Sequence, residues 1–352
     1  MDIRSNFLHD IRVITFNLLS PEITSSHFFP TVRKINLDFT KRTERTKKLM
    51  QSWIKVNFII CTQEMSARWK DVLEPFFVEN EYGFIYDIYS SGKMGVGIAY
   101  PLKHYDLIDV NKFTCSQIIE PIYNSFKQLL IKSSDTQSEK ILTEFESASE
   151  SKNTLLSLLL KAKHFGKSIN KNLIVSTYHM PCRYNLKYFM CAHIHAIKVH
   201  LQDLLLIWNT QYENTLSVIV TGDFNITAKS SEYNYFVGID IETDSELLDN
   251  TAETFIKDLT NLYLAINKNL FGGIKLKSTH KTLHNKEPLY TNICIQGEKH
   301  FVECLDYILI NDQIDIRSCT VGLSVEDPIN TPYPNKLCPS DHLPLSASLR
   351  IR

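Results

Sequence analysis

Two polar residues with complementary chemistry follow a strand-like run in the middle of the chain. The run 216–221 has the length and β-branched content of a buried strand, and Gly222-Asp223-Phe224-Asn225 follows it. On an extended segment, Asp223 and Asn225 point the same way. A carboxylate oxygen beside an amide oxygen suits a hard divalent cation and a water molecule that must lose a proton. The segment therefore indicates metal-assisted chemistry on water.

Further candidate groups lie within or just after strand-like runs that are far apart in the chain. They are Asn17, Glu64, His179, Asp306, Asp341 and His342. Because ligand groups in layered α/β folds gather where strands end and loops begin, we expect these side chains to converge. Four carboxylates, two carboxamides and two imidazoles would then share one cleft, an oxygen-rich set that suits Mg²⁺ or Mn²⁺ better than zinc. Phosphoester hydrolysis needs the phosphate charge offset, a water activated and the developing negative charge stabilised. This set offers a metal ligand, a carboxylate base and an imidazole donor for these tasks.

Each of these residues also has a structural interpretation when it is considered alone. Asp341-His342 could cap a turn, and His179 could be a hydrogen-bonded core histidine. Asn17 could start a turn, and Asp306 could lie at the edge of a sheet. Their occurrence together, each at a strand end, favours the catalytic interpretation.

The composition is that of an ordinary globular protein. The chain has 352 residues, of which 43% are hydrophobic and 22% are charged, and its formal net charge is −1. No whole-molecule field attracts a polyanion, so such a substrate requires a local basic surface or metal ions. The eight cysteines form no CxxC pair, and no apolar stretch near the first residues or elsewhere has the length expected of a signal peptide or a membrane span. These features predict a reducing, cytoplasmic location and no membrane partner.

Short apolar runs and periodic stretches predict the elements that position the polar set. Strands are expected at 11–16, 58–62, 82–87, 95–100, 155–163, 173–178, 216–221, 278–281, 305–310 and 346–351. Helices are expected at 43–54, 185–208, 231–236 and 245–266. The irregular alternation favours a mixed two-sheet α/β sandwich over a parallel sheet.

Two stretches carry further expectations. Residues 132–153 are rich in Ser, Lys and Glu and are predicted to form an exposed polar insertion, so that a single domain spans residues 1–352. The histidines of the long helix are expected at the surface or the core edge rather than as ligands: His193, His195 and His200.

The ordered set resembles the endonuclease/exonuclease/phosphatase superfamily, whose founding members resemble DNase I. The resemblance runs from Asn17 to His342 and is weakest over 132–153. Segments 287–292, 305–308 and 339–345 are similar to the branch of carbon-catabolite-repressor-type deadenylases, nocturnin and 2′-phosphodiesterases. The resemblance implies a four-layer α/β/β/α sandwich of two mixed β-sheets flanked by helices.

The resemblance also implies a role for each residue on the metal side of the site. Glu64 would be the principal metal ligand, with Asn17 beside it and Asp341 near the metal. Asp223 would activate the water, and Asn225 would orient the phosphate or a second metal. The implied cofactor is Mg²⁺, with Mn²⁺ as the alternative.

The remaining roles concern the phosphate and the substrate. His342 would contact the scissile phosphate with Asp306 paired to it, and His179 would stabilise the transition state. Phe301 matches the aromatic residue on which such enzymes stack a terminal base, a contact worth ~1–3 kcal/mol. Asn292 would also bind substrate.

One substrate position departs from the family pattern. Poly(A)-specific relatives have a proline about where this chain has Tyr184, whereas Pro181 comes earlier. Tyr184 can stack on a base, but the departure removes the basis for adenine selectivity. The pattern begins near residue 11, so we expect no docking to a deadenylase complex through leucine-rich repeats.

The favoured hypothesis is a Mg²⁺-dependent phosphodiester hydrolase, a 3′-to-5′ exoribonuclease of deadenylase type that acts on poly(A) or single-stranded RNA. A second hypothesis is a phosphatase or phosphodiesterase of a small nucleotide such as 2′-5′ oligoadenylate or NADPH. A third is a non-catalytic nucleic-acid-binding module. An RNA enzyme should lose affinity steeply with salt, and a mononucleotide enzyme much less.

Overall fold

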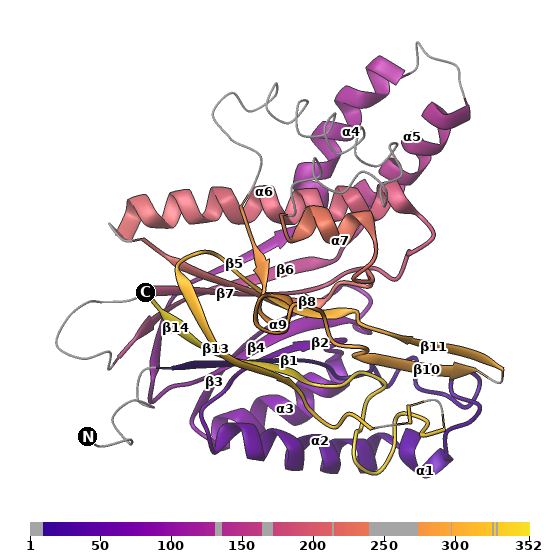
Figure 1. Cartoon of the computed structure of the whole chain (residues 1–352), viewed down its shortest axis with the longest axis vertical. Helices are drawn as coiled ribbons and strands as arrows, with labels where there is room; N and C mark the ends of the chain where they lie inside the picture. Colours follow the sequence, from indigo (N-terminus) through magenta and orange to yellow (C-terminus); the bar gives the residue numbers. More distant parts are fainter. Residues whose placement is uncertain are drawn as a thin grey trace.

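The protein is a sandwich of two six-stranded mixed sheets with helices on both outer faces (Figure 1). The computed structural model describes residues 10–130, 136–163, 172–212, 215–238, 274–296, 298–325, 327–328 and 330–352. The four-layer α/β/β/α prediction is confirmed.

The first sheet contains the two ends of the described chain. Its strands in spatial order are β13 (Ile314–Val321), β14 (Leu345–Ile351), β1 (Ile11–Asn17), β2 (Ile59–Gln63), β4 (Gly95–Pro101) and β3 (Tyr82–Ile88). Only β1 and β2 are parallel neighbours in it. Its outer layer consists of α1 (Lys34–Leu37), α2 (Phe39–Ile54) and α3 (Ala67–Glu79). Asp38 caps α2 by accepting a hydrogen bond from the Lys41 N–H.

The second sheet lies between the first sheet and a longer helical layer. Its strands in spatial order are β5 (Tyr105–Thr114), β6 (Thr154–Ala162), β7 (Asn172–His179), β8 (Ser217–Asp223), β12 (Asp306–Ile310) and β9 (Lys277–Ser278). Only β7 and β8 are parallel neighbours in it. Its outer face is covered by α6 (Lys187–Tyr212) and α7 (Ser231–Phe236).

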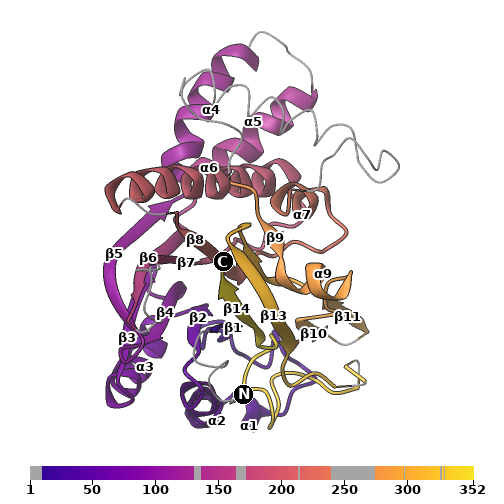
Figure 2. The same cartoon turned by 60° about the vertical axis from the view of Figure 1, so that its left-hand side comes forward.

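Three smaller parts complete the described fold. The pair α4 (Ser116–Leu130) and α5 (Thr136–Ser149) packs on α6 and projects away from the sandwich (Figure 2). Strands β10 (Asn292–Gln296) and β11 (Lys299–Glu303) form a separate antiparallel hairpin, and α9 (Thr279–His284) follows β9. No helix among the described residues is both long enough and apolar enough to cross a membrane.

The facing sides of the two sheets are apolar and pack against each other. Ile59 and Ile98 of the first sheet belong to the same buried cluster as Leu158 and Ile308 of the second. Polar contacts also cross between the sheets, such as the hydrogen bond that Gln63 Nε2 donates to Thr177 Oγ1 at 2.8 Å. The apolar contact aligns the two sheets, and polar side chains at their strand ends are thereby brought to one edge.

Most predicted strands and helices are confirmed, with two corrections. Only Lys277–Ser278 of the expected strand 278–281 is extended, because the Ser278 side chain accepts a hydrogen bond from the Lys281 N–H and starts α9. In the described part of the expected insertion 132–153, the chain is not simply exposed, because α5 buries Phe145 and Ala148. The expected helix 245–266 lies outside the described residues, and the single domain over 1–352 stays a prediction.

Candidate active site

Three predicted residues form a row across the second sheet. His179 at the end of β7 pairs with Asp223 at the end of β8, which pairs in turn with Asp306 at the start of β12. Gly222 makes this close arrangement possible, because a Cβ atom there would lie 2.1 Å from the Tyr178 carbonyl oxygen. The strand register therefore places two carboxylates and an imidazole side by side.

The first sheet supplies the opposite wall of the site. Asn17 ends β1, and Glu64 follows β2 with φ 54°, a left-handed conformation that is uncommon for residues other than glycine. Asn17 Nδ2 donates to Glu64 Oε1 at 3.1 Å and to Asp223 Oδ2 at 2.9 Å. The other Glu64 oxygen, Oε2, accepts from the Ser20 N–H at 2.6 Å. Asn17 thus joins the carboxylates of the two sheets.

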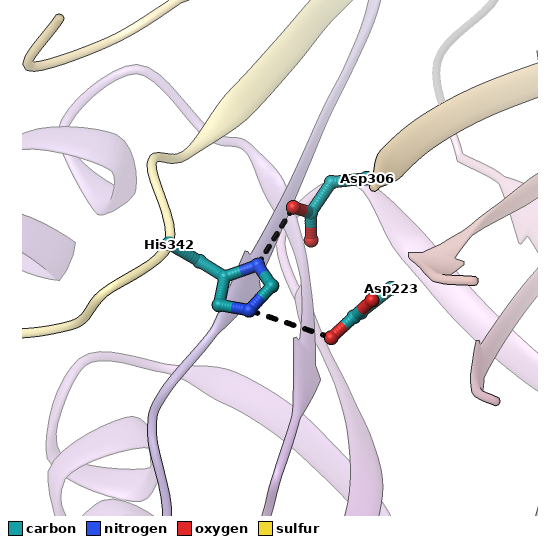
Figure 3. Close-up of side chains that lie close together, drawn as sticks. All are labelled: Asp223, Asp306 and His342. Atoms are coloured by element: carbon teal, nitrogen blue, oxygen red, sulfur yellow. Dashed lines mark hydrogen bonds and ion pairs between the residues drawn. The ribbon is translucent and has the colours of Figure 1, made fainter. Parts of the chain in front are cut away.

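His342 lies between two carboxylates (Figure 3). Its Nδ1 is 2.8 Å from Asp306 Oδ2, and its Nε2 is 3.5 Å from Asp223 Oδ2. His179 Nε2 approaches the same Asp223 oxygen at 3.7 Å. Asp223 therefore faces both histidines, while Asp306 holds His342 from the far side.

The electrostatics of the site differ from those of an ordinary buried region. Burial raises the pKa of Asp223, and it raises the pKa of Asp341 to about 6. Burial by itself would lower the pKa of His342, but Asp306 and Asp223 outweigh it and raise that pKa well above its usual value. A protonated His342 donates from Nδ1 to Asp306 and presents a second N–H towards Asp223. Perturbed groups gathered in this way are typical of catalytic sites.

The residues present fit a hard divalent cation. Asp223, Asp306 and His342 have ligand atoms within 4.8 Å of one another, but both His342 nitrogens face carboxylates, so we interpret them as a hydrogen-bonded chain rather than a metal cage. Glu64 and Asp341 are both buried, and their negative charges act on each other. Buried, mutually repelling carboxylates suit Mg²⁺ or Mn²⁺. Glu64, Asp341 and Asn17 are the residues that would hold the ion.

Asn225 differs from its predicted orientation. The chain leaves the extended conformation after β8, and Asn225 has φ 49°. Its N–H turns back to donate to Asp223 Oδ1 at 3.0 Å, while its side-chain Nδ2 donates to the Met180 carbonyl at 2.8 Å. The expectation of an extended segment with both side chains parallel is wrong, although Asn225 does lie at the site.

The three predicted substrate residues differ in their exposure to solvent. Asn292 is buried, forms a β-bridge with His342 and directs its Nδ2 to the Asp341 carbonyl at 3.5 Å. Phe301 on β11 is 42% exposed, and Tyr184 after β7 is 77% exposed. Both aromatic rings are therefore accessible to a base, and their roles stay predictions.

Three supporting residues were missed by sequence reasoning. Thr291 Oγ1 accepts the N–H groups of Leu305 and Asp306, both at 3.0 Å, and so fixes the start of β12. Asn153 Nδ2 donates to the His179 carbonyl at 2.7 Å. Arg42 is buried beneath the loops of the site. Asn153 lies in the stretch interpreted as an insertion, and Arg42 lies on an ordinary amphipathic helix, so neither carried a recognisable signal.

Several solved structures have the same fold. ANGEL2, a 2′,3′-cyclic phosphatase solved with adenosine-2′,3′-vanadate, has a TM-score of 0.69 at 17% identity, covering 97% of this chain and 96% of that one. The human Nocturnin catalytic domain has a TM-score of 0.60 at 15% identity, and the match covers 97% of this chain and 95% of that one. A mannosyl-6-phosphatase of Bacteroides thetaiotaomicron has a TM-score of 0.54 at 14% identity, and the match covers 96% of this chain and 99% of that one.

The family assignment comes from sequence. No curated protein sequence matches the chain. The sequence model of one family, however, matches residues 14–342, a range that contains every member of the polar set. The chain belongs to the Endonuclease/Exonuclease/phosphatase family, and the prediction of an enzyme that hydrolyses phosphoester bonds is confirmed at that level.

Proposed function

We propose that the chain is a divalent-metal-dependent phosphodiesterase that shortens single-stranded RNA from its 3′ end, as an exoribonuclease of deadenylase type acting on poly(A) or a similar strand. The observation that carries the proposal is the Asp223–His342–Asp306 chain, which lies beside the buried carboxylates Glu64 and Asp341. It combines a base, a charged donor and a metal-binding pair in one buried cluster.

Each protein group has a separate task in this reaction. Asp223 accepts a proton from the attacking water, and the raised pKa of its buried carboxyl makes it a stronger base than an exposed aspartate. The water oxygen bonds to phosphorus as the bond to the leaving oxygen breaks, and that oxygen takes up a proton from solvent to leave as a hydroxyl group. His342 donates from Nε2 to a phosphate oxygen, and Asp306 keeps its ring in place. A cation held by Glu64 and Asp341 would offset the negative charge of the phosphate.

The exposed aromatic residues support a single-stranded substrate. Phe301 and Tyr184 lie on different segments and offer ring faces to unpaired bases. Stacking tolerates every base, so it provides affinity without strong sequence selectivity. Because the net charge is only −1, binding relies on such stacking and on the metal site rather than on a general positive field.

A second candidate is a phosphatase or phosphodiesterase that acts on a small nucleotide or on a nucleotide end. Its support is the likeness to ANGEL2, which was solved as a 2′,3′-cyclic phosphatase with an adenosine-2′,3′-vanadate ligand. The same protein groups would open a cyclic phosphate or remove a terminal one without shortening the strand. Its substrates would include 2′-5′ oligoadenylate, an NADPH-like dinucleotide and a 2′,3′-cyclic phosphate end.

A panel of 5′-labelled RNAs separates the two candidates. The strands carry an A-tail or a mixed tail, ending in a 3′-hydroxyl or a 2′,3′-cyclic phosphate, and are tested beside 2′-5′ oligoadenylate and NADPH with Mg²⁺ or Mn²⁺. We expect a ladder of shortened products from strands with a 3′-hydroxyl, and none from Asp223→Asn. Conversion of the cyclic end without a ladder would favour the second candidate. Binding of RNA without any metal-dependent product would contradict both.

A further inference from the structure

Arg42 is a fully buried cation whose hydrogen bonds, among the residues that the structure describes, all go to uncharged groups. It lies on α2, its side chain is inaccessible, and burial lowers its pKa to about 10, so it stays charged at neutral pH. Its Nε donates to the Pro339 carbonyl at 2.7 Å, and its Nη1 donates to Thr24 Oγ1 at 3.0 Å. Its Nη2 donates to the carbonyl oxygens of Leu18 and Leu19. A buried charge satisfied in this way indicates a fixed position for the loops it contacts.

The first of these loops, 18–24, supports the carboxylate of Glu64. Leu19 donates its N–H to Asn17 Oδ1 at 2.9 Å, and Ser20 donates its N–H to Glu64 Oε2 at 2.6 Å. Thr24 Oγ1, which accepts from Arg42, donates in turn to the Ser20 carbonyl at 2.7 Å. The guanidinium therefore fixes the backbone that presents one N–H to the glutamate.

The second loop leads directly to the other carboxylate. The Pro339 carbonyl lies two residues before Asp341, so Arg42 bridges the chain segments of both buried acids. Its charge also acts on Asp341 and Glu64, which repel each other. No other residue that the structure describes is shown donating to both loops.

We propose that Arg42 is a positioning residue for the metal site, which holds Glu64 and Asp341 at the separation that a divalent cation requires. The proposal rests on the metal-dependent function proposed above. Arg42 contributes through geometry, because its positive charge by itself opposes the binding of a cation. Groups that orient metal ligands typically change metal affinity ~10–100-fold when they are altered.

The chain offers a control for a merely structural role. Arg45 lies one turn further along the same helix, where its Nη1 donates to Asn36 Oδ1 at 2.9 Å and to the Asn335 carbonyl at 3.1 Å. None of these acceptors lies in loop 18–24 or in 339–341. Lysine in place of either arginine retains the charge and removes the planar fork that reaches several acceptors.

Metal affinity of the full chain tests the proposal without any substrate. Mn²⁺ is titrated into wild type, Arg42→Lys, Arg45→Lys and Glu64→Gln, and free Mn²⁺ is followed by electron paramagnetic resonance at a temperature where all four are folded by circular dichroism. We expect Arg42→Lys to weaken the dissociation constant by about tenfold or more, and Glu64→Gln to abolish measurable binding. Arg45→Lys should stay within about twofold of wild type, because its acceptors support no predicted ligand.

The possible failures of the proposal differ from those of the proposed function. A wild-type dissociation constant in Arg42→Lys, with a lowered melting temperature, would show that Arg42 only stabilises the fold, and the proposed function would stand. Absence of Mn²⁺ binding in wild type would overturn both. If Arg42→Lys does not fold, Thr24→Val and Thr24→Ser take its place. Weaker Mn²⁺ binding in Thr24→Val, but not in Thr24→Ser, supports the proposal. Equal Mn²⁺ affinity in wild type, Thr24→Val and Thr24→Ser overturns it.

Discussion

Two regions of the molecule bury histidine, and the state of the ring differs completely between them. At the site, His342 is 4% exposed and lies between Asp306 and Asp223. On α6, His193 is fully buried, and its Nδ1 pairs with the Tyr178 hydroxyl at 2.7 Å. Carboxylates raise the pKa of His342 well above its usual value, whereas burial lowers the pKa of His193 to about 3.

The comparison shows that burial alone does not decide the charge of a histidine. Desolvation disfavours the imidazolium in both regions, and only the facing carboxylates reverse its effect at the site. The neutral His193 fills the core and pairs with a hydroxyl, which requires no charge. The charged His342 is held between two carboxylates, and in the proposed reaction it donates a hydrogen bond to the phosphate. Function therefore depends on the partners of the buried ring.

The largest expected effect contrasts the two histidines directly. His342→Gln should lower kcat by about 10²–10⁴-fold, because it removes the charged donor of the proposed reaction. His193→Gln should leave kcat within about twofold, since its contacts lie in the core around α6. Both are measured with the RNA substrate cleaved by wild type, after circular dichroism shows a folded protein. Equal losses in the two variants would remove the distinction between a catalytic and a structural histidine.

The loss of folding stability in acid should depend on His193, the histidine that does not affect kcat. His193 has a folded pKa of about 3 against about 6.5 when unfolded, so the unfolded state binds more protons between these values and stability falls as pH drops through this window. At pH 5 this one group should lower the free energy of unfolding by about 2 kcal/mol relative to neutral pH. Urea unfolding at pH 5 and pH 7.5 measures the difference, which should shrink by a similar amount in His193→Gln. An unchanged difference would contradict the assigned pKa.

Much of the site could be predicted because its residues stand at the ends of recognisable strands. Asn17, Glu64 and Asp223 each follow a β-branched apolar run, and strand ends meet at one edge of a layered fold. The orientation of Asn225 could not be predicted from the sequence, because its left-handed backbone conformation interrupts the extended pattern. His193 was expected at the surface or the core edge, but it is fully buried where α6 packs on the second sheet, and its ring meets the hydroxyl of Tyr178 on β7.

The residues that support the site could not be predicted, for a related reason. Arg42 and Asn153 act on backbone carbonyl groups of other segments, and any residue type offers such a carbonyl. Their partners are therefore decided by tertiary packing and leave no pattern in the sequence. The buried face of α5 was hidden in the same way, because Phe145 and Ala148 stand among serines and glutamates.

The smallest expected effect tests whether the placement of Asp306 accounts for the charged state of His342. Thr291 Oγ1 accepts the N–H groups of Leu305 and Asp306, and the Thr291 carbonyl accepts the Leu343 N–H at 2.7 Å. Thr291→Val removes the hydroxyl at nearly constant volume and leaves two buried donors without it, at a cost of ~1–3 kcal/mol in stability. Thr291→Ser retains the acceptor and should stay close to wild type.

If Thr291 positions the Asp306–His342 pair, the valine variant should also lose kcat by about tenfold, a loss that serine rescues. Proton NMR of the imidazole N–H supplies an independent measurement, since a hydrogen bond between His342 Nδ1 and a carboxylate shifts that resonance to low field. Loss of the low-field signal in Thr291→Val would show that His342 has lost its hydrogen bond to Asp306 and resembles the neutral His193 more closely. An unchanged signal and an unchanged kcat in a destabilised variant would show that Thr291 stabilises the sheet without affecting the histidine.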